Sequence, residues 1–383
     1  MSLAWMAAAV LAFAAAYSTV IYPILVIALA AVRPRPWREA DVDHAVVHII
    51  TVHNEENRIA RKLDNALSLE PPPGGLRTVV ADDGSDDATA SIVARYRSRG
   101  VGWVDGPRAG KERAQIEAVR SASEPILVFS DASTWLEPDA IAQIVRPFAD
   151  VGVAAVSGWD RLSGETGTGE DLYVRYEMAL RRAESRAGSL VGLSGCFFAC
   201  RREIAQQLQP DVPSDMGAAL IALRSGRRAV AQERARCSYT AARRVGQEFS
   251  RKRRTALRGM NCLRAYPGAM SWRRPVPTWQ LVSHKWMRFA SPWFAVVGAT
   301  AFAWASIADG MTATTAAVTI GVAGACGLGS LALVSPALRR FGPLRSLGFA
   351  VVSAAAVLAA WTDFVSGRKH VTWSPTRRTG AGR

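Results

Sequence analysis

Apolar and polar positions are distributed unevenly along this 383-residue chain. Long stretches carry no charged residue, whereas the region at about 33–288 mixes apolar and charged positions in the proportions of an ordinary folded domain. The uncharged stretches are 2–32, 289–308, 310–338 and 346–362. Because a helix needs roughly 20 apolar residues to cross a bilayer, the first three stretches are long enough and the fourth is marginal.

This distribution predicts four parts. They are an N-terminal transmembrane anchor at 1–32, a domain at 33–288 with basic helices at its membrane-proximal end, two or three C-terminal membrane helices within 289–366, and a basic tail at 367–383. The first stretch lacks a basic n-region and is much longer than the apolar region of a signal peptide, which favours a retained anchor.

Within the domain, strand-like apolar runs alternate with helical patterns. In the first predicted helix Ile59, Leu63 and Ala66 share one face. Alternating strands and helices with short links predict an α/β fold with a doubly wound, Rossmann-like parallel sheet. Ligands of such sheets lie beyond the carboxyl ends of the strands. The predicted strands are 45–52, 76–81, 101–104 and 126–130, with helices at 54–69, through Ile92 and Tyr96, and at 111–120.

Polar side chains follow three of these strands. Each group also has a purely structural interpretation, as a helix cap or as turn chemistry. Clustered carboxylates repel one another unless a cation or a donor-rich ligand offsets them, so their joint placement at one edge points to a ligand. The residues are His53, Asn54 and Glu55 after the first strand, Asp82 and Asp83 after the second, and Asp131 with Ser133 after the fourth.

A nucleotide sugar fits such an edge, since its base and ribose offer hydrogen-bond donors and its diphosphate brings a divalent ion. Mg²⁺ typically takes one or two carboxylates together with substrate phosphates, so Asp131 alone is chemically sufficient. Lys111 begins a predicted helix after Gly110, from where its ammonium group could reach the phosphates. The alternative for Lys111 is a solvated lysine on a helix surface.

The net charge of +15 does not indicate a nucleic-acid partner. The basic residues gather beside the membrane segments and at 243–274, without an aromatic ladder or zinc-finger spacing. Arg33, Arg35 and Arg38 follow the anchor, and the positive-inside rule therefore puts the domain in the cytoplasm and the N-terminus outside. Three further spans would then leave the basic tail outside, which contradicts the same rule. The five cysteines are scattered, without the paired spacing or nearby histidines of a zinc site, which argues against such a site, and they fit a reducing compartment.

At this point the chain resembles the membrane-bound family 2 glycosyltransferases, inverting enzymes with a GT-A fold that are related to polysaccharide synthases. The similarity runs over nearly the whole chain. It is carried by TVHNEENRIARKLDNAL (51–67), VADDGSDDAT (80–89), GKERAQ (110–115), SDAST (130–134), VGLSGCFFACRRE (191–203), VPSDMGAAL (212–220), RKRRTALRGM (251–260) and SHKWMRFASPW (283–293).

The resemblance implies a role for each matching residue. His53, Asn54, Glu55, Asp82, Asp83, Lys111, Arg251 and Arg254 would hold the nucleotide sugar; Asp131, with Ser133 as a further ligand, would bind Mg²⁺ or Mn²⁺; and Asp215 would be the catalytic base, with Asp211 as its nearest competitor. The chain departs from the family pattern at Ser133, where a second acid is usual, and at Thr255, where polysaccharide synthases have tryptophan.

The implied activity is inverting transfer of a sugar from a nucleotide diphosphate sugar, expected to be a UDP-sugar, to a hydroxyl of a lipid-linked or saccharide acceptor. The protein would be integral to a bacterial plasma membrane, in contact with its lipids, with the catalytic domain in the cytoplasm. Two alternatives stay open: a processive polysaccharide synthase, which the missing tryptophan disfavours, and a non-catalytic membrane scaffold that keeps the fold.

Overall fold

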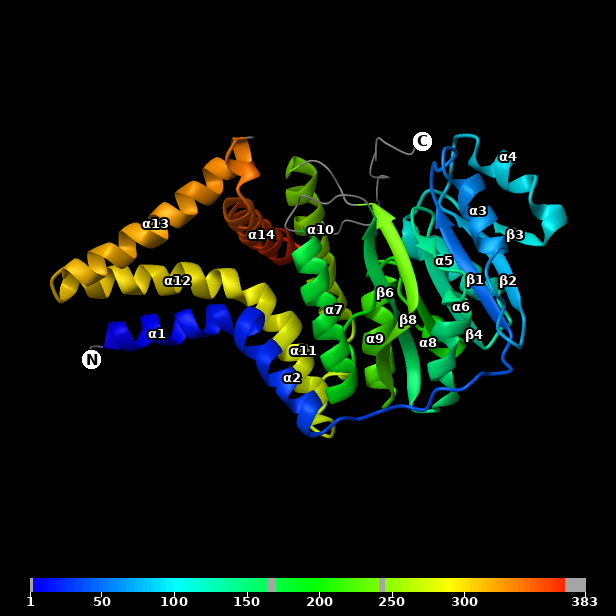
Figure 1. The fold of residues 1–383 in the computed structure, drawn as a ribbon, viewed down its shortest axis with the longest axis horizontal. Helices are drawn as coiled ribbons and strands as arrows, with labels where there is room; N and C mark the ends of the chain where they lie inside the picture. The colour runs from blue at the N-terminus through cyan, green and yellow to red at the C-terminus, as the bar shows by residue number, and fades with distance from the viewer. Residues whose placement is uncertain (1–2, 164–169, 241–244, 336, 369–383) are drawn as a thin grey trace.

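The computed structural model describes residues 3–163, 170–240, 245–335 and 337–368. It consists of an α/β domain and an arm of long helices that projects from one side of the domain (Figure 1). Residues 369–383 of the predicted tail, and Arg243 of the predicted basic stretch, lie outside the described residues.

The first half of the sheet is parallel, in the order β3-β2-β1-β4. Every residue of β1 is buried, which explains its run of Val and Ile. Val52 pairs with Asp82 and Thr51 with Asp131, so the carboxyl ends of β2, β1 and β4 form one edge. This half of the domain confirms the predicted alternation. Its elements are β1 Val46–Val52, α3 Ile59–Leu67, β2 Leu76–Asp82, α4 Thr89–Ala94, β3 Val101–Val104, α5 Lys111–Ser121 and β4 Ile126–Asp131.

The second half of the sheet is mixed rather than parallel. β7 is antiparallel to β4 and to β6, and β8 is parallel to β6 and antiparallel to β5. The complete order is β3-β2-β1-β4-β7-β6-β8-β5. The predicted parallel strands thus end with β4, and the strands beyond it, which the sequence pattern did not predict, form the mixed half. The elements are β5 Trp135–Leu136, α6 Ala140–Val145, β6 Val153–Ser163, α7 Glu170–Ala187, β7 Phe197–Arg201, α8 Arg202–Ala205, α9 Ser214–Arg224, β8 Arg228–Thr240 and α10 Val245–Ala265.

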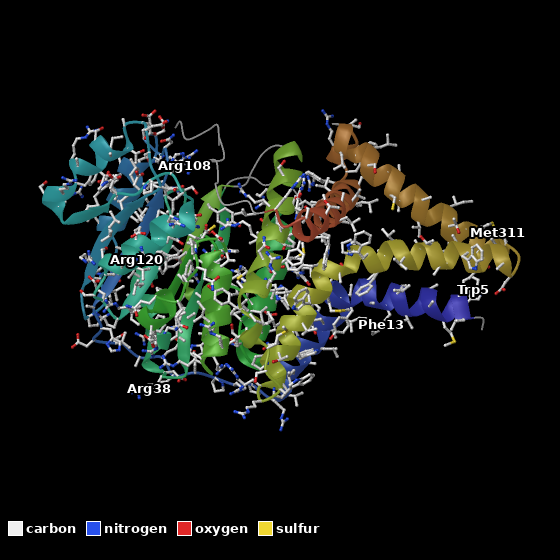
Figure 2. All side chains as sticks on the ribbon, turned by 180° about the vertical axis from the view of Figure 1, so that it is seen from behind. Trp5, Phe13, Arg38, Arg108, Arg120 and Met311 are labelled. Carbon is white, nitrogen blue, oxygen red and sulfur yellow. The ribbon has the colours of Figure 1, made fainter. Side chains whose placement is uncertain are left out.

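In the described part of the chain, four helical segments are long and apolar enough to cross a membrane, namely Leu3–Val32, Pro275–Ala308, Ala313–Leu333 and Gly342–Val365. In Figure 2 charged side chains gather on the α/β domain, while Trp5 and Met311 lie together at the far tip of the arm. The helices of the arm are α1 Leu3–Ala16, α2 Tyr22–Val32, α11 Pro275–Leu281, α12 Met287–Ala308, α13 Ala313–Val334 and α14 Gly342–Val365, with π-helical turns at Tyr17–Ile21 and Val282–Trp286.

The two π-helical turns meet where the arm joins the domain. There the hydroxyl groups of Tyr17 and Ser283 share a hydrogen bond of 3.0 Å. One carboxylate oxygen of Glu184, on α7, accepts from the Tyr22 hydroxyl at 2.5 Å and lies 2.6 Å from Nδ1 of His284. Glu184 thus fixes the domain to both membrane helices at once.

Inside the domain, Lys62 is fully buried beneath the turn that follows β4. Its exposed fraction is 0%, and its ammonium group donates to the carbonyl of Thr134 at 2.7 Å. Burial lowers the pKa of Lys62 to about 7, although Cys237 and Asp131 act in the opposite direction. The side chain thereby ties α3 to the turn that carries Asp131 and Ser133.

We expect Lys62 to make stability depend on pH between about 7 and 10.5. In this window the unfolded chain keeps a proton on Lys62 that the folded chain has lost, so the Lys62 contribution improves as the pH rises, by up to about 5 kcal/mol. Thermal unfolding of the wild type and of Lys62→Met at pH 7 and pH 9.5 measures it. Relative to the wild type, Lys62→Met should be more stable at pH 7 and should lose that advantage at pH 9.5. A stability difference that does not change with pH would contradict a lowered pKa of Lys62.

Candidate functional site

An ion pair stands at the edge formed by the carboxyl ends of β2, β1 and β4. Lys111 begins α5, directly after Gly110, whose φ of 105° is readily adopted only by glycine. Its Nζ donates to Asp131 at 2.6 Å and to the carbonyl of Gly195 at 3.0 Å. Burial opposes the charge of Lys111, but the carboxylates of Asp131 and Glu112 raise its pKa above the ordinary value.

Asp82 lies at the end of β2 on the same edge. Its carboxylate accepts from the backbone N–H of Ser85 at 2.8 Å and from the Ser85 hydroxyl at 2.5 Å. Burial raises the pKa of Asp82 in spite of these bonds, and Asp105 raises it further, while the nearby His53 lowers it. The sequence prediction of Asp82 and His53 at one edge agrees with their positions; it did not include Asp105.

The side chain of Asp83 makes its contacts within the protein. Its side chain is fully buried and accepts from the backbone N–H groups of Ala109 at 2.8 Å and Gly110 at 2.6 Å, and it pairs with Arg108. These bonds hold the loop that starts α5 and therefore set the position of Lys111. The structure gives Asp83 an organising role beside its predicted contact with the nucleoside, which stays a prediction.

Asn54 and Glu55 also make contacts within the domain. Asn54 has a left-handed backbone, with φ of 51°, and its amide group donates to Asp86 at 2.6 Å. The buried carboxylate of Glu55 accepts from Arg58 at 2.8 Å. The Asn54 side chain joins the loops after β1 and β2, as does the backbone N–H of Glu55, which donates to Thr89 at 2.9 Å. The predicted contact of Asn54 and Glu55 with a nucleotide sugar stays a prediction.

Asp215 lies across Gly195 from the Lys111–Asp131 pair. It is half-buried in the first turn of α9, and it makes no hydrogen bond to any other described residue. A Cβ atom added at Gly195 would lie 3.2 Å from its Oδ2. The carboxylate therefore faces the same short loop whose carbonyl binds Lys111. Asp211 lies just before α9, four residues ahead of Asp215.

A buried network holds that loop, at 192–195, in place. Arg181 of α7 donates to Asp160 at 3.1 Å and to the carbonyl of Leu193 at 3.3 Å. The hydroxyl of Ser194 donates to Asp160 at 2.5 Å, while its backbone N–H donates to Ser157 at 2.9 Å. Arg181, Asp160 and Ser157 were not predicted, because single charged residues in a strand and a helix give no sequence signal of their pairing.

The arginines of α10 approach the start of α5 from the other side. Arg258 pairs with Glu112, the residue after Lys111. Burial, together with the neighbouring charges of Arg258 and Arg251, lowers the pKa of Arg254. Arg254 forms no hydrogen bond or ion pair within the described part of the chain, so its guanidinium group is available to an anion. The predicted pair Arg251 and Arg254 therefore lies with Arg258 in one positively charged group beside α5.

Lys285 is a further cation that the sequence prediction did not single out. It lies in the π-helical turn before α12, and its Nζ would be 3.2 Å from a Cβ atom added at Gly192. Among the described residues no hydrogen bond or ion pair engages its ammonium group. In sequence Lys285 resembles the lysines and arginines that commonly flank membrane helices, so the sequence gives no signal of its position beside Gly192.

The residues at the end of β4 fit a cation that is shared with phosphate oxygens. Asp131 has a side chain 32% exposed, and Ser133 makes no hydrogen bond within the described residues. No group of three or more His, Cys, Asp or Glu side chains in the described part of the chain could enclose a metal ion. One carboxylate with a hydroxyl nearby suits Mg²⁺ or Mn²⁺ delivered by a diphosphate, and does not suit a cage made by protein alone.

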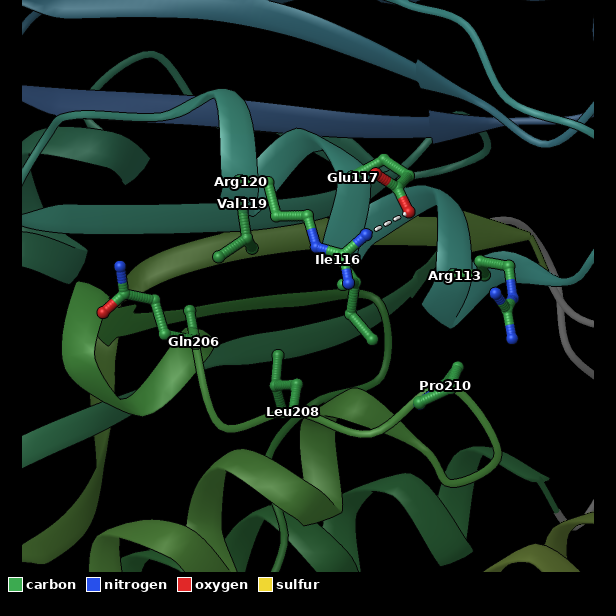
Figure 3. A pocket seen from close by; sticks show the side chains of 9 residues that line it. Arg113, Ile116, Glu117, Val119, Arg120, Gln206, Leu208 and Pro210 are labelled. Carbon is green, nitrogen blue, oxygen red and sulfur yellow. Dashed lines mark hydrogen bonds and ion pairs between the residues drawn. The ribbon is translucent and has the colours of Figure 1, made fainter.

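A cavity of about 330 Å³ lies elsewhere, between α5 and the chain around α8 (Figure 3). Its lining from α5 consists of Arg113, Ile116, Glu117, Val119 and Arg120. All but Val119 follow the spacing i, i+3, i+4 and i+7 of one helix face. Lys111 is on a different face, and none of the predicted site residues lines this cavity. The chemistry of the strand edge is therefore separate from it.

Comparisons with known proteins agree with this geometry. The Glycosyl transferase family 2 profile matches residues 48–209. An N-acetylglucosaminyltransferase of Mesorhizobium japonicum is 27% identical over 176 residues, which are 44% of this chain and 40% of that protein. Hyaluronan synthase of Streptococcus pyogenes is 25% identical over 183 residues, 44% of this chain and 43% of the synthase. The chain thus spans less than half the length of these two relatives.

Among solved structures, this chain resembles the mannosyltransferase PcManGT from Pyrobaculum calidifontis, solved in complex with GDP-Man and Mn²⁺. The similarity covers 96% of this chain and 100% of PcManGT, with a TM-score of 0.72 and 25% sequence identity. The expected fold class is confirmed, and the profile match agrees with the expected family. Residues 48–209 of this chain match the Glycosyl transferase family 2 profile and lie in a domain with a GT-A fold, joined to helices that are long and apolar enough to cross a membrane.

Proposed function

We propose that this protein transfers a sugar from a nucleotide diphosphate sugar to a hydroxyl group of an acceptor held at the membrane. The observation that carries the proposal is the arrangement about Gly195, with the Lys111–Asp131 pair on one side and the unbonded carboxylate of Asp215 on the other. A cation and a carboxylate suit a diphosphate, and a second carboxylate suits an incoming hydroxyl group.

The donor half is assigned to the edge of β2, β1 and β4. Asp82 and His53 would face the base and ribose, and Lys111 with Arg254 would face the diphosphate. PcManGT was solved with GDP-Man, and the curated relatives are named for N-acetylglucosamine transfer and hyaluronan synthesis. We infer a UDP-sugar, as the resemblance to family 2 implies, and a lipid-linked or saccharide acceptor that arrives from the side of the arm.

The chemistry follows from these positions. Asp215 takes the proton of the acceptor hydroxyl group, whose oxygen forms a bond to the anomeric carbon. The bond from that carbon to the diphosphate breaks on the opposite face, so the anomeric configuration inverts. Lys111, Arg254 and Arg258, which gather about the start of α5, would stabilise the charge that develops on the departing nucleoside diphosphate.

A divalent cation fits this scheme. Asp131 would hold it, with Ser133 as a weaker ligand, and when bound it supplies further charge stabilisation for the leaving diphosphate. The solved neighbour contains Mn²⁺. In the same place Lys111 pairs with Asp131, so the charge of this one carboxylate is balanced within the chain.

Substitution of Asp215 tests its proposed role as the catalytic base. Asp215→Asn should lower kcat by about 10²–10⁴-fold, because the amide cannot take the acceptor proton. Donor affinity should hardly change, since Asp215 lies across Gly195 from the donor half. Transfer of labelled sugar, and calorimetric titration with UDP, measure the two quantities.

Asp211→Asn is the matched control, because it removes the competing carboxylate four residues earlier and should retain most of the activity. Loss of activity in Asp211→Asn alone would move the base to Asp211. Unchanged turnover in both variants would favour the non-catalytic scaffold. A product with more than one added sugar would favour a processive synthase.

A second prediction concerns the cation. In Asp131→Asn the increase in UDP affinity that Mn²⁺ produces should disappear, because the amide is a poor ligand for a hard cation. Ser133→Ala should reduce that increase only slightly. Titration with UDP, with and without Mn²⁺, gives both results. An undiminished effect of Mn²⁺ in Asp131→Asn would remove this residue from the cation site.

A further inference from the structure

The last apolar helix, α14, raises the question of which helices cross the membrane. Trp5, at the start of α1, donates through its indole N–H to Asp309, at the end of α12, at 2.7 Å. The start of α1 and the end of α12 therefore share the tip of the arm (Figure 2). From that tip α13 runs back toward the domain, and Gly329, near its end, lies against Leu347 and Val351 of α14 (Figure 1).

α14 contacts the domain near its end. The carboxylate of Asp363 is 1% exposed and binds the guanidinium group of Arg253, on α10, through two hydrogen bonds of 2.7 Å. The guanidinium carbon of Arg264 lies over the ring of Phe364, 5.1 Å from the ring centroid. The indole N–H of Trp361 donates to the carbonyl of Phe289 at 2.8 Å, at the base of α12.

α14 also contacts the domain near its beginning. The ammonium group of Lys252 lies 4.0 Å from the ring centroid of Phe349, and Tyr173 of α7 lies 6.0 Å from the same ring. Phe349 and Asp363 are separated by roughly 21 Å along a helix axis, yet they contact the adjacent residues Lys252 and Arg253. The axis of α14 therefore runs across α10 and not away from it.

The depth of α14 relative to the membrane follows from the charged residues of α10 that it contacts. Residues 251–254 are four consecutive cations, which are costly to place within the hydrocarbon core. They must lie near the membrane surface, and the contacts of Lys252 with Phe349 and of Arg253 with Asp363 hold the part of α14 between Phe349 and Asp363 at that level. If α14 crossed the bilayer, one of the two contacts would require a charged residue of α10 deep in the lipid.

We propose that α14 lies along the membrane surface on the side of the α/β domain, clasped to α10 by Asp363, and that the described chain crosses the membrane three times. Its apolar character has two uses, since one face packs on Ala256, Leu257 and Met260 of α10 and the other meets the acyl chains. The basic tail then begins on the domain side. This agrees with the positive-inside rule, which four crossings would violate.

Thiol labelling of the full-length chain in membrane vesicles tests this topology. Cys326 is exposed and Cys196 is half-buried, so both are first replaced by alanine. In this background the single variants Ser98→Cys, Met311→Cys and Ser374→Cys report on the domain, the tip of the arm and the tail. We expect a membrane-impermeant maleimide to label Ser98→Cys and Ser374→Cys in inverted vesicles, and Met311→Cys only in right-side-out vesicles. Labelling of Ser374→Cys together with Met311→Cys would overturn the proposal. Neither result depends on the transferase activity.

A charge exchange tests the clasp separately. Arg253→Asp and Asp363→Arg each place like charges together, so each should lower the melting temperature of the purified protein. The double variant restores an ion pair and should recover most of the loss. Absence of recovery, with correct folding of the double variant shown by circular dichroism, would mean that Asp363 does not hold α14 on α10.

Discussion

The buried ion pair between Arg181 and Asp160 is the constraint on which the rest of the site depends. Two charges removed from water cost several kcal/mol each, so their retention needs good geometry and further hydrogen bonds. Both are supplied, because Asp160 also accepts from Ser194 and Arg181 also donates to the carbonyl of Leu193. The pair thereby fixes the loop at 192–195, and with it the position of Gly195 between Lys111 and Asp215.

The same helix that carries Arg181 carries Glu184, less than one turn later. Glu184 binds Tyr22 and His284 of the membrane helices, whereas Arg181 binds the loop beside the candidate base. Because α7 is a single rigid helix between these contacts, the placement of the arm and the placement of the loop are set together. A membrane-bound acceptor would therefore meet the candidate base at a fixed height above the bilayer.

The sequence was informative wherever a local pattern decides the structure. Parallel strands bring their carboxyl ends to one edge, so Asp82 and Asp131 could be placed together from strand periodicity alone, and their register with β1 agrees. Gly110 before a helical pattern likewise placed Lys111. The mixed half of the sheet was beyond such reasoning, since the order and direction of β6, β7 and β8 depend on pairings between distant segments.

Roles that depend on a distant partner could not be predicted. Asp83 looks like a ligand contact in sequence, yet its oxygens bind Arg108, Ala109 and Gly110, more than twenty residues away. Lys62 looks like a solvated helix lysine and is fully buried. In both cases the sequence supplies the polar group, and only the tertiary structure decides whether a ligand, the solvent or the protein satisfies it.

Electrostatics explain why a single acid at the end of β4 is sufficient. Asp131 and Lys111 form a neutral pair, and the pKa of Lys111 is raised, so the pair persists at neutral pH. A second carboxylate at position 133 would leave one negative charge uncompensated and would make the local structure depend on a bound cation. With Ser133 no such charge is added, and the proposed cation, arriving with a diphosphate, would find one carboxylate, one hydroxyl group and the phosphate oxygens.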